Sequence, residues 1–353
     1  MKINVSNKLL ILDGIGGIDL GRNLAASIRS QGVLTEYRNM AEMPKIAMYK
    51  PRSAIAKIRN KKNDKDSFYC LPKCDFDQLE KQICQFKPKK ILVIGFLYKF
   101  FEPLRLKRLA DKLGIELFLY DTDSCNLYSS RREFIFFIEN ELIVYGSIFS
   151  FSRVITDFFK RKKLNAFFCP FGDTIKTRQS SAEPEIDVLF VGSADLRRIF
   201  LLENIVEKVT IYGNRWQRQW PLMSEQLQQK VIDKPIWGEQ LQLKLSASKI
   251  VLNITRIPFY GAETGINHRI FEAMSMGCFV LTDHCDEIAE LFEIGQEIET
   301  FKGMEELKQK VEYYLQHEEQ RQQIAERGYQ RFLKHYTWQQ RSAELLKKMG
   351  LLS

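Results

Sequence analysis

Residues 248–281 read SKIVLNITRIPFYGAETGINHRIFEAMSMGCFVL, and this stretch decides the fold. The apolar run Ile250–Ile254 predicts a buried strand, and Cys278–Leu281 predicts a second one. Between them, His268–Met276 has apolar residues at helical spacing and ends before Gly277. A strand, a helix and a strand in such quick succession form a βαβ unit, which requires a parallel sheet.

The same alternation extends outward to both ends of the chain. The other expected strands are Leu9–Leu12, Val33–Tyr37, Lys90–Ile94, Glu116–Tyr120, Leu142–Tyr145, Val188–Val191, Val209–Tyr212 and Glu297–Phe301. The expected helices include Ile18–Ser30, Phe76–Phe86, Leu104–Leu113, Phe134–Ile138, Val154–Phe159, Leu196–Val206, Gln240–Ser246, Glu287–Phe292, Glu305–Leu315, Glu319–Leu333 and Trp338–Met349. Residues 41–67 lack a regular period and predict a loop with a short helix.

A polar stretch, Thr174–Glu185, has no hydrophobic period and marks a domain boundary. The length of 353 residues also suits two domains, each large enough to bury its own core. The fold class is therefore α/β, with two tandem doubly wound, Rossmann-like domains. We expect an N-terminal domain at residues 1–172, a C-terminal domain at 183–334 and a final helical segment at 335–353.

The composition excludes several classes of protein. No window approaches the roughly 18 uncharged apolar residues of a membrane span, and the N-terminal run LLIL, which ends at Asp13, is not expected to be a secretion signal. The seven cysteines are scattered without a CxxC pair, so we expect reduced thiols, no zinc site and a cytoplasm-like compartment.

The net charge of +9 has two main sources. Residues 45–65 contain eight basic residues and one acid, and residues 160–163 read KRKK. Such clusters can simply be solvated surface. They can equally bind an anionic membrane, a polyanionic acceptor or a nucleic acid. Because no nucleic-acid-binding module is recognisable, we do not expect a nucleic-acid partner.

A glycine-containing loop, Asp13-Gly-Ile-Gly-Gly17, follows the first expected strand and opens a helix. Glycines allow a close approach of the backbone to an anion, and the helix N-terminus supplies N–H groups. The third glycine of the dinucleotide fingerprint is missing, and Glu36 is the one acid near the end of the second strand. A tight turn without a ligand remains the alternative.

The second half carries two further loops of this kind. Gly192 and Ser193 follow a strand, Ser193 is placed to cap the next helix, and Arg197 and Arg198 follow one turn later. Such arginines bind a diphosphate or simply face solvent. Arg269 and Glu272 lie one turn apart on the expected helix after residue 267 and can form a surface ion pair. Because the helix is mostly apolar, the alternative is that both charges are buried and need partners.

Taken together and in order, these elements resemble the C-terminal domain of group-1-type GT-B glycosyltransferases, closest to the branch named for the spore-maturation protein CgeB. The resemblance covers residues 186–349. Its matching elements are Asp187–Ser193, Ile211–Gly213, Ser248–Asn253, Asn267–Gly277, Val280–Asp283, Glu290–Gly295, Ile324–Gly328 and His335–Trp338. It implies a GT-B fold with an inter-domain cleft and a terminal helix that packs back on the first domain.

The resemblance also implies where a nucleoside diphosphate sugar binds. Glu272 would bind the ribose hydroxyls, Arg269 and the Gly192–Arg198 loop the diphosphate, and Trp237 the base. The full set of expected donor-binding residues is Gly16, Gly17, Gly192, Ser193, Arg197, Arg198, Tyr212, Gly213, Ile236, Trp237, Arg256, Glu263, Thr264, Gly265, Ile266, Asn267, Arg269 and Glu272.

One departure from the family concerns catalysis. Retaining group-1 enzymes have a second glutamate eight positions before the ribose-binding one, and that position is Thr264 here. An inverting enzyme instead needs a general base to deprotonate the acceptor. The candidates are Asp13, Asp19, Asp121 and Asp123; the Asp121-Thr-Asp123 pair is favoured, with a simple capping turn as the alternative.

The sequence therefore predicts a hexosyltransferase-like enzyme that needs no cofactor and no metal. Arginines and helix N-termini would stabilise the leaving diphosphate. The expected acceptor is a glycan, a lipid-linked molecule or a protein, anionic or membrane-associated, with the enzyme cytoplasmic and peripheral to the inner face of the membrane. The alternatives are an inactive nucleotide-sugar-binding protein of the same fold and an NAD-dependent Rossmann enzyme.

Overall fold

The computed structural model describes residues 8–16, 19–62, 68–176 and 186–352. The chain divides into two compact units, residues 1–170 with 338–353 and residues 171–337. The boundary thus lies at Phe171 rather than after Gly172, and the return to the first unit begins at Trp338 rather than at residue 335. Among the described residues, no helix is long and apolar enough to cross a membrane.

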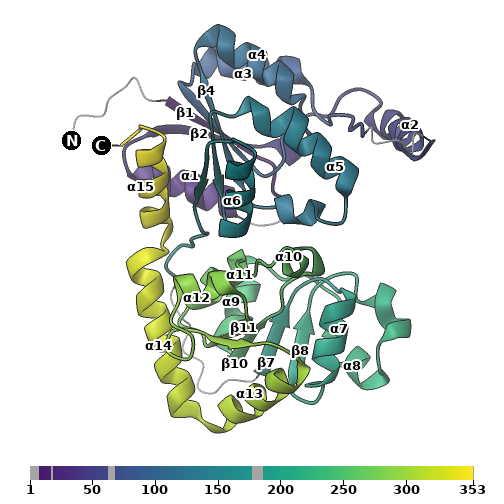
Figure 1. Cartoon of the computed structure of the whole chain (residues 1–353), viewed down its shortest axis with the longest axis vertical. Helices are drawn as coiled ribbons and strands as arrows, with labels where there is room; N and C mark the ends of the chain where they lie inside the picture. Colours follow the sequence, from purple (N-terminus) through teal and green to yellow (C-terminus); the bar gives the residue numbers. More distant parts are fainter. Residues whose placement is uncertain (1–7, 17–18, 63–67, 177–185, 353) are drawn as a thin grey trace. The chain divides into compact units, whose positions relative to one another are not determined.

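The first unit is built on a parallel six-stranded sheet with the order β2-β1-β3-β4-β5-β6 (Figure 1). Its strands are β1 Lys8–Asp13, β2 Leu34–Asn39, β3 Lys90–Ile94, β4 Glu116–Asp121, β5 Ser147–Ser150 and β6 Ala166–Phe168. Its helices are α1 Leu20–Ser30, α2 Tyr49–Lys62, α3 Phe76–Phe86, α4 Pro103–Leu113, α5 Arg131–Phe136, α6 Arg153–Arg161 and α15 Trp338–Lys348. Since the chain goes from β1 to β2 and returns across β1 to β3, the winding reverses between β1 and β3.

The terminal helix α15 lies beside α1 in this unit (Figure 1). The hydroxyl groups of Ser27 and Ser342 are 2.8 Å apart, and the side-chain amide of Gln31 donates to the backbone carbonyl of Gln339. The last segment of the chain is therefore part of the first unit, although the second unit precedes it in sequence.

The second unit contains another parallel six-stranded sheet, with the order β12-β11-β10-β7-β8-β9. Its strands are β7 Ile186–Val191, β8 Val209–Tyr212, β9 Val231–Ile232, β10 Ser248–Asn253, β11 Val280–Asp283 and β12 Glu299–Phe301. Its helices are α7 Leu196–Glu203, α8 Glu225–Gln229, α9 Gly238–Ser246, α10 Ile257–Gly261, α11 His268–Met274, α12 Asp286–Leu291, α13 Met304–Gln316 and α14 Glu318–His335. The winding reverses between β7 and β10, because β8 and β9 lie on one side of this pair and β11 and β12 on the other.

Close backbone packing at the end of β8 requires a glycine. A Cβ atom on Gly213 would lie 1.8 Å from the carbonyl oxygen of Gly192. The same carbonyl accepts a hydrogen bond from the indole N–H of the fully buried Trp216, at 2.9 Å. The loop after β7 is thus held in place by Gly213 and Trp216, which follow the neighbouring strand β8.

The observed secondary structure differs from the expected one in several places. Leu142–Val144 is a 3-10 turn, and the strand of this region is Ser147–Ser150, because a short apolar run does not distinguish a buried strand from a buried turn. The loop with a short helix expected over residues 41–67 contains α2, whose 14 residues make it longer than expected. The helix α10 was not expected, since its five residues are too few to show a period.

Candidate functional site

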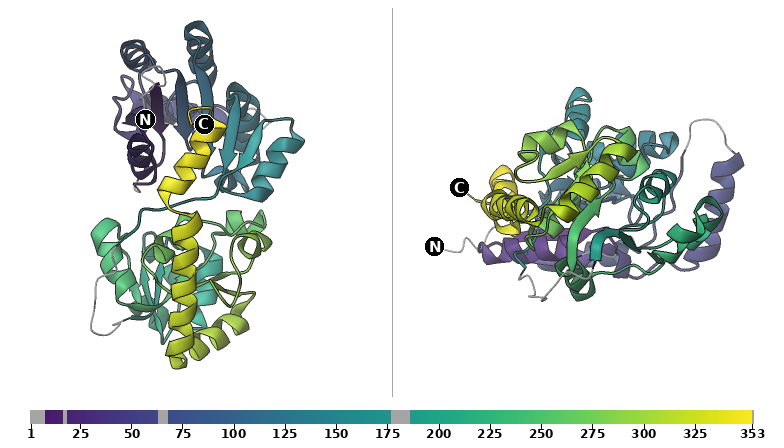
Figure 2. Two further views of the ribbon diagram at one scale, coloured as in Figure 1. Left: turned by 90° about the vertical axis from the view of Figure 1, so that its left-hand side faces the viewer. Right: turned by 90° about the horizontal axis from the view of Figure 1, so that it is seen from below.

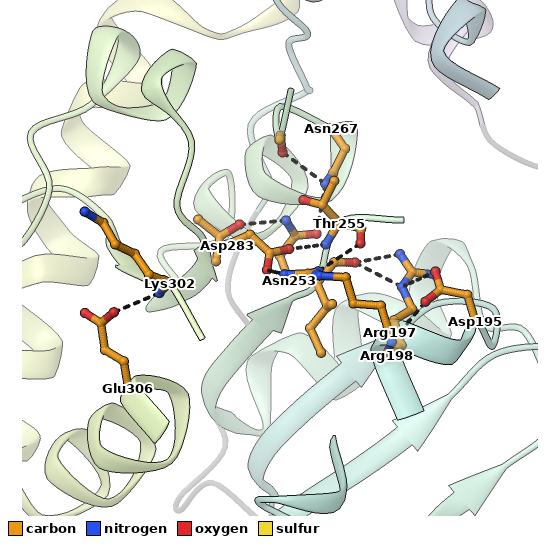
Figure 3. Close-up of polar contacts among 12 residues, drawn as sticks. Asp195, Arg197, Arg198, Asn253, Thr255, Asn267, Asp283, Lys302 and Glu306 are labelled. Carbon is orange, nitrogen blue, oxygen red and sulfur yellow. Dashed lines mark hydrogen bonds and ion pairs between the residues drawn. The ribbon is translucent and has the colours of Figure 1, made fainter. Parts of the chain in front are cut away.

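Ligands of doubly wound sheets bind outside the carboxyl ends of the strands at the point where the winding reverses. In the second unit this point lies between β7 and β10. The loop after β7 holds Gly192 and Ser193, and β10 ends at Asn253, followed by Ile254 and Thr255. Figure 3 shows that polar side chains from α7, β10 and the strand end of β11 meet here.

Arg198 joins the two strand ends. Its Nε and Nη2 atoms donate to the carbonyl oxygen of Ile254, at 3.0 and 2.7 Å, and its Nη1 donates to the carbonyl of Ser193 at 2.7 Å. The residue as a whole is 7% exposed, and burial lowers its pKa to about 10, which leaves it protonated at neutral pH. All three bonds point into the protein, so the contacts of Arg198 organise the loop.

Arg197 lies closer to the surface than its neighbour. Its Nη2 atom is 2.5 Å from an oxygen of the buried Asp283, and its guanidinium lies 3.8 Å from the centre of the Tyr260 ring. The other oxygen of Asp283 accepts the backbone N–H of Thr255 (Figure 3). Since 19% of the Arg197 side chain is exposed, against 9% of the Arg198 side chain, Arg197 is the more accessible arginine of the pair.

The start of α11 is fixed to the end of β10 through amide side chains. The Asn253 amide donates to Thr282 at 2.8 Å, and the Asn267 amide donates to the oxygen of Asn253 at 3.0 Å. The Asn267 oxygen in turn accepts the backbone N–H of Arg269 and so caps the helix. This chain of contacts sets the position from which the next turn of α11 presents Arg269 and Glu272.

Glu272 lies among cations. Its two oxygens are 2.5 Å from Arg269 Nη1 and 3.6 Å from Lys176 Nζ, and Lys176 is also 2.7 Å from the buried Asp173. Burial alone would raise the pKa of Glu272, but Arg269, His268 and Lys176 outweigh it, so the pKa lies below its usual value. Glu272 is therefore an ionised carboxylate that is 15% exposed.

The loop between α10 and α11 is tightly packed. Thr264 is buried and donates its hydroxyl hydrogen bond to the buried Glu287 of α12. A Cβ on Gly265 would lie 2.8 Å from the Cys285 sulfur, which explains the glycine, and Ile266 is completely buried. Glu263 is exposed and has a positive φ of 58°. The position that carries a second glutamate in the resembling family thus holds a threonine linked to a different carboxylate.

The remaining predicted donor-binding residues of this unit are spread along the same edge of the sheet. Trp237 is 47% exposed at the start of α9, and the preceding Ile236 is buried. Tyr212 ends β8 next to Gly213, and Arg256 is exposed immediately before α10. Trp237 is therefore the member of this set with an aromatic face open to solvent.

The candidate bases lie at the carboxyl edge of the first sheet. Asp13 ends β1 and accepts hydrogen bonds from the Ile15 N–H and the Tyr37 hydroxyl, both at 2.8 Å. A Cβ on Gly21 would lie 2.1 Å from Asp13 Oδ2, so the start of α1 accommodates this carboxylate because it has a glycine there. Burial raises the pKa of Asp13 to about 6, although both hydrogen bonds lower it.

The favoured pair Asp121 and Asp123 separates into two environments. Asp121 is buried and accepts hydrogen bonds from the N–H and hydroxyl of Ser124 and from the hydroxyl of Ser150, at 2.7 to 2.9 Å. Burial raises the pKa of Asp121. Asp123 is half-buried and accepts from the Asn126 amide at 2.8 Å. Asp121 thus holds the loop after β4, while Asp123 reaches toward solvent.

The glycine-containing loop of the first unit is described in part. Gly14 donates its N–H to the carbonyl of Ile94, and Gly16 is exposed, whereas Gly17 lies outside the described residues. Strand β2 ends at Arg38 and Asn39, so no acid stands at the position that binds an NAD ribose in the dinucleotide fold. Among the residues described in either unit, no three His, Cys, Asp or Glu side chains form a group that would hold a metal.

Sequence reasoning did not single out Asp173, Lys176, His268, Asp283 or Glu287. Asp283 ends β11 and Glu287 lies in α12 just after it, and a polar residue at the end of a buried strand was the available signal. Lys176 lies in the polar stretch interpreted as a domain boundary, and nothing local indicates that it meets Glu272. That contact depends on tertiary structure.

Two parallel six-stranded sheets of this topology define the GT-B class of fold, and the chain has this fold. A family model described as "Glycosyl transferase-like" matches residues 197–347, the part of the chain that carries Arg197, Asp283 and Glu272. No curated protein sequence is significantly similar to the chain.

Solved glycosyltransferase structures are similar along nearly the whole chain. Sucrose-phosphate synthase from Thermosynechococcus elongatus has a TM-score of 0.67 at 12% identity, with 98% of each chain covered. HepE from Anabaena, solved in complex with UDP-glucose, has a TM-score of 0.66 at 14% identity, with 97% of this chain and 99% of that chain covered. A glycosyltransferase from Rickettsia africae has a TM-score of 0.60 at 10% identity, with 97% of each chain covered. At these identities the similarity concerns the fold.

Proposed function

We propose that this protein is a glycosyltransferase that moves a sugar from a nucleoside diphosphate sugar to a nucleophilic acceptor. The observation that carries the proposal is the ionised Glu272, held by Arg269 and Lys176 beside the point where the winding of the second sheet reverses. A carboxylate accepts hydrogen bonds from two neighbouring ribose hydroxyls, and cations beside it attract phosphates. The complex of the similar HepE with UDP-glucose supports a donor of this chemical class.

The roles follow from exposure and contacts. Glu272 binds the ribose, Arg269 and Arg197 bind the diphosphate, and Trp237 stacks on the base. The loop 263–267 lies against the donor sugar. Arg198 acts as a positioning residue, because its three hydrogen bonds hold the loop of Gly192 and Ser193 in place.

The acceptor must lose a proton as its oxygen bonds to the anomeric carbon and the diphosphate departs. We propose Asp123 as the base, since it is half-buried, whereas Asp13 and Asp121 are buried and their carboxylates already accept hydrogen bonds within the protein. Negative charge that develops on the diphosphate is stabilised by Arg197 and Arg269, so the proposed reaction needs no metal.

Several finer features belong to the same proposal. The ordered motifs of residues 186–349 support membership of the CgeB-like branch. The net charge of +9 supports an acceptor, whether a glycan, a lipid-linked molecule or a protein, that is anionic or lies on a membrane. A cytoplasmic enzyme peripheral to the inner membrane face is consistent with the free cysteines.

The test is a thermal-shift screen of UDP, GDP, ADP, CMP and dTDP sugars on three proteins. These are the wild type, Glu272→Gln and the control Glu312→Gln, which changes an exposed carboxylate of α13. A bound ligand raises stability by RT ln(1 + [L]/Kd). We expect one nucleotide class to stabilise the wild type and the control, with at least a tenfold weaker affinity for Glu272→Gln. Equal shifts in all three proteins would place the donor elsewhere.

A second candidate function is a nucleotide-sugar-binding protein without turnover. The observation that favours it is the buried Thr264–Glu287 contact at the position where the resembling retaining enzymes have a glutamate. Hydrolysis of the bound donor, measured as release of nucleoside diphosphate without any acceptor, separates the two. Turnover above the level of Glu272→Gln excludes the binding protein.

A further inference from the structure

The helix α2 presents an unusual surface to solvent. Residues 45–62 contain seven basic residues and no acid. Met48 is 73% exposed, Ile55 is 53% exposed and Ile58 is 55% exposed. Figures 1 and 2 show α2 at the periphery of the first unit, outside the helices that cover its sheet.

The orientation of α2 is fixed by its inner face. Tyr49, Ser53, Ala56 and Asn60 recur at helical spacing and are the less exposed residues of the helix. The Asn60 side chain exchanges two hydrogen bonds with the backbone of Tyr69, at 2.6 and 3.0 Å. The face turned toward the protein therefore has one aromatic ring and otherwise small or polar side chains, with no aliphatic stripe.

The outer face consequently mixes apolar and basic residues. Ile55 lies three residues after Arg52 and three before Ile58, so these three side chains share one side of the helix. Lys50 and Lys57 are exposed on its flank. A surface helix normally turns its isoleucines toward the protein core, whereas Ile55 and Ile58 of α2 face solvent.

We propose that the surface formed by Lys45, Met48, Lys50, Arg52, Ile55, Lys57 and Ile58 docks the protein on an anionic lipid bilayer. The isoleucines and Met48 enter the boundary between headgroups and acyl chains, and the cations pair with lipid phosphates. Charge alone would fit a nucleic acid, but the exposed apolar side chains have no role there. The inference rests on the peripheral membrane location proposed above and names the surface that makes the contact; it holds whether or not the chain turns over a donor.

The test is co-sedimentation of the full chain with vesicles of phosphatidylcholine alone or mixed with phosphatidylglycerol. We expect binding to the anionic vesicles. Lys50→Gln/Arg52→Gln/Lys57→Gln should weaken it about a hundredfold, at roughly fivefold for each cation near the surface. Ile55→Ser/Ile58→Ser, which keeps every charge, should weaken it about tenfold or more.

A matched control removes the same charge elsewhere. Lys160→Gln/Arg161→Gln/Lys162→Gln changes the second basic cluster and should leave binding within about threefold of wild type. Circular dichroism melts show whether each variant is folded. The proposal is overturned if the wild type does not bind, if the serine variant binds like the wild type, or if the control loses as much as the α2 variant. A serine variant that binds normally while heparin competes with the vesicles would point to a polyanion instead.

Discussion

Replacing Arg198 by methionine separates a structural role from ligand binding. The sequence left Arg198 either binding a diphosphate or facing solvent, and the family resemblance implied the diphosphate. In the structure its guanidinium makes three hydrogen bonds to two backbone carbonyls, those of Ile254 and Ser193. Arg198→Met keeps the length of the side chain but leaves both carbonyl oxygens without these donors.

The magnitude follows from the two acceptors. Each buried carbonyl left unsatisfied costs about 1–3 kcal/mol. Removing the guanidinium also removes the cost of its burial, so we expect a net loss near the lower half of the sum, about 3 kcal/mol. For a unit of this size that loss lowers the melting temperature by about 6–12 °C.

The assay is urea unfolding of the unliganded protein, monitored by tryptophan fluorescence. Trp216, Trp220 and Trp237 lie in the second unit, which makes this signal sensitive to the region of Arg198. Arg218→Met makes the same change at an exposed position of that unit and should alter stability by less than about 0.5 kcal/mol. An Arg198→Met protein that unfolds at the wild-type midpoint but has lost its donor-induced shift would refute the structural assignment.

Three further predictions concern buried positions. Burial raises the pKa of Asp13 from 3.8 to about 6, so the folded state holds the proton more tightly than the unfolded state does. The free energy of unfolding should therefore fall as the pH rises from about 4 to 6, by at most about 3 kcal/mol. In urea unfolding, Asp13→Asn should show a flatter dependence of stability on pH. Gly213→Ala places a Cβ 1.8 Å from a backbone oxygen and should cost about 3 kcal/mol or more, whereas Gly303→Ala, with nothing within 4 Å, should be nearly neutral in the same assay. Thr264→Val removes the hydrogen bond to buried Glu287 and should cost about 1.5–3 kcal/mol; an unchanged melting temperature would contradict the contact.

The hydrophobic pattern predicted most of the fold because the strands of both sheets are short, apolar and separated by helical periods. It failed where the pattern is ambiguous. Leu142–Val144 has the composition of a buried strand, yet it forms a turn before β5. The helix α2 was expected only as a short helix within a loop, because its inner face carries no apolar stripe that would show its full length.

From the sequence, the candidate site could be predicted only as the set of loops that follow the strand ends. Periodicity does not show which of two adjacent arginines turns inward, and the structure buries Arg198 while Arg197 stays partly exposed. Nor does it show contacts between distant segments. The ion pair between Lys176 and Glu272 joins segments that are far apart in the sequence. The same holds for the hydrogen bond from Thr264 to Glu287. No local sequence pattern encodes such tertiary contacts.

If Glu272 binds the ribose as proposed, the charges around it couple recognition of the ribose to recognition of the diphosphate. In the unliganded protein each carboxylate here already has a cation, since Glu272 pairs with Arg269 and Asp173 pairs with Lys176. A ribose that donates two hydrogen bonds to Glu272 competes with Arg269 for the same oxygens. In the proposed complex the guanidinium would then need a new acceptor, and the diphosphate attached to that ribose would supply one. A nucleoside without phosphates would offer Arg269 no such exchange, so we expect the proposed site to bind the nucleoside diphosphate more tightly than its nucleoside.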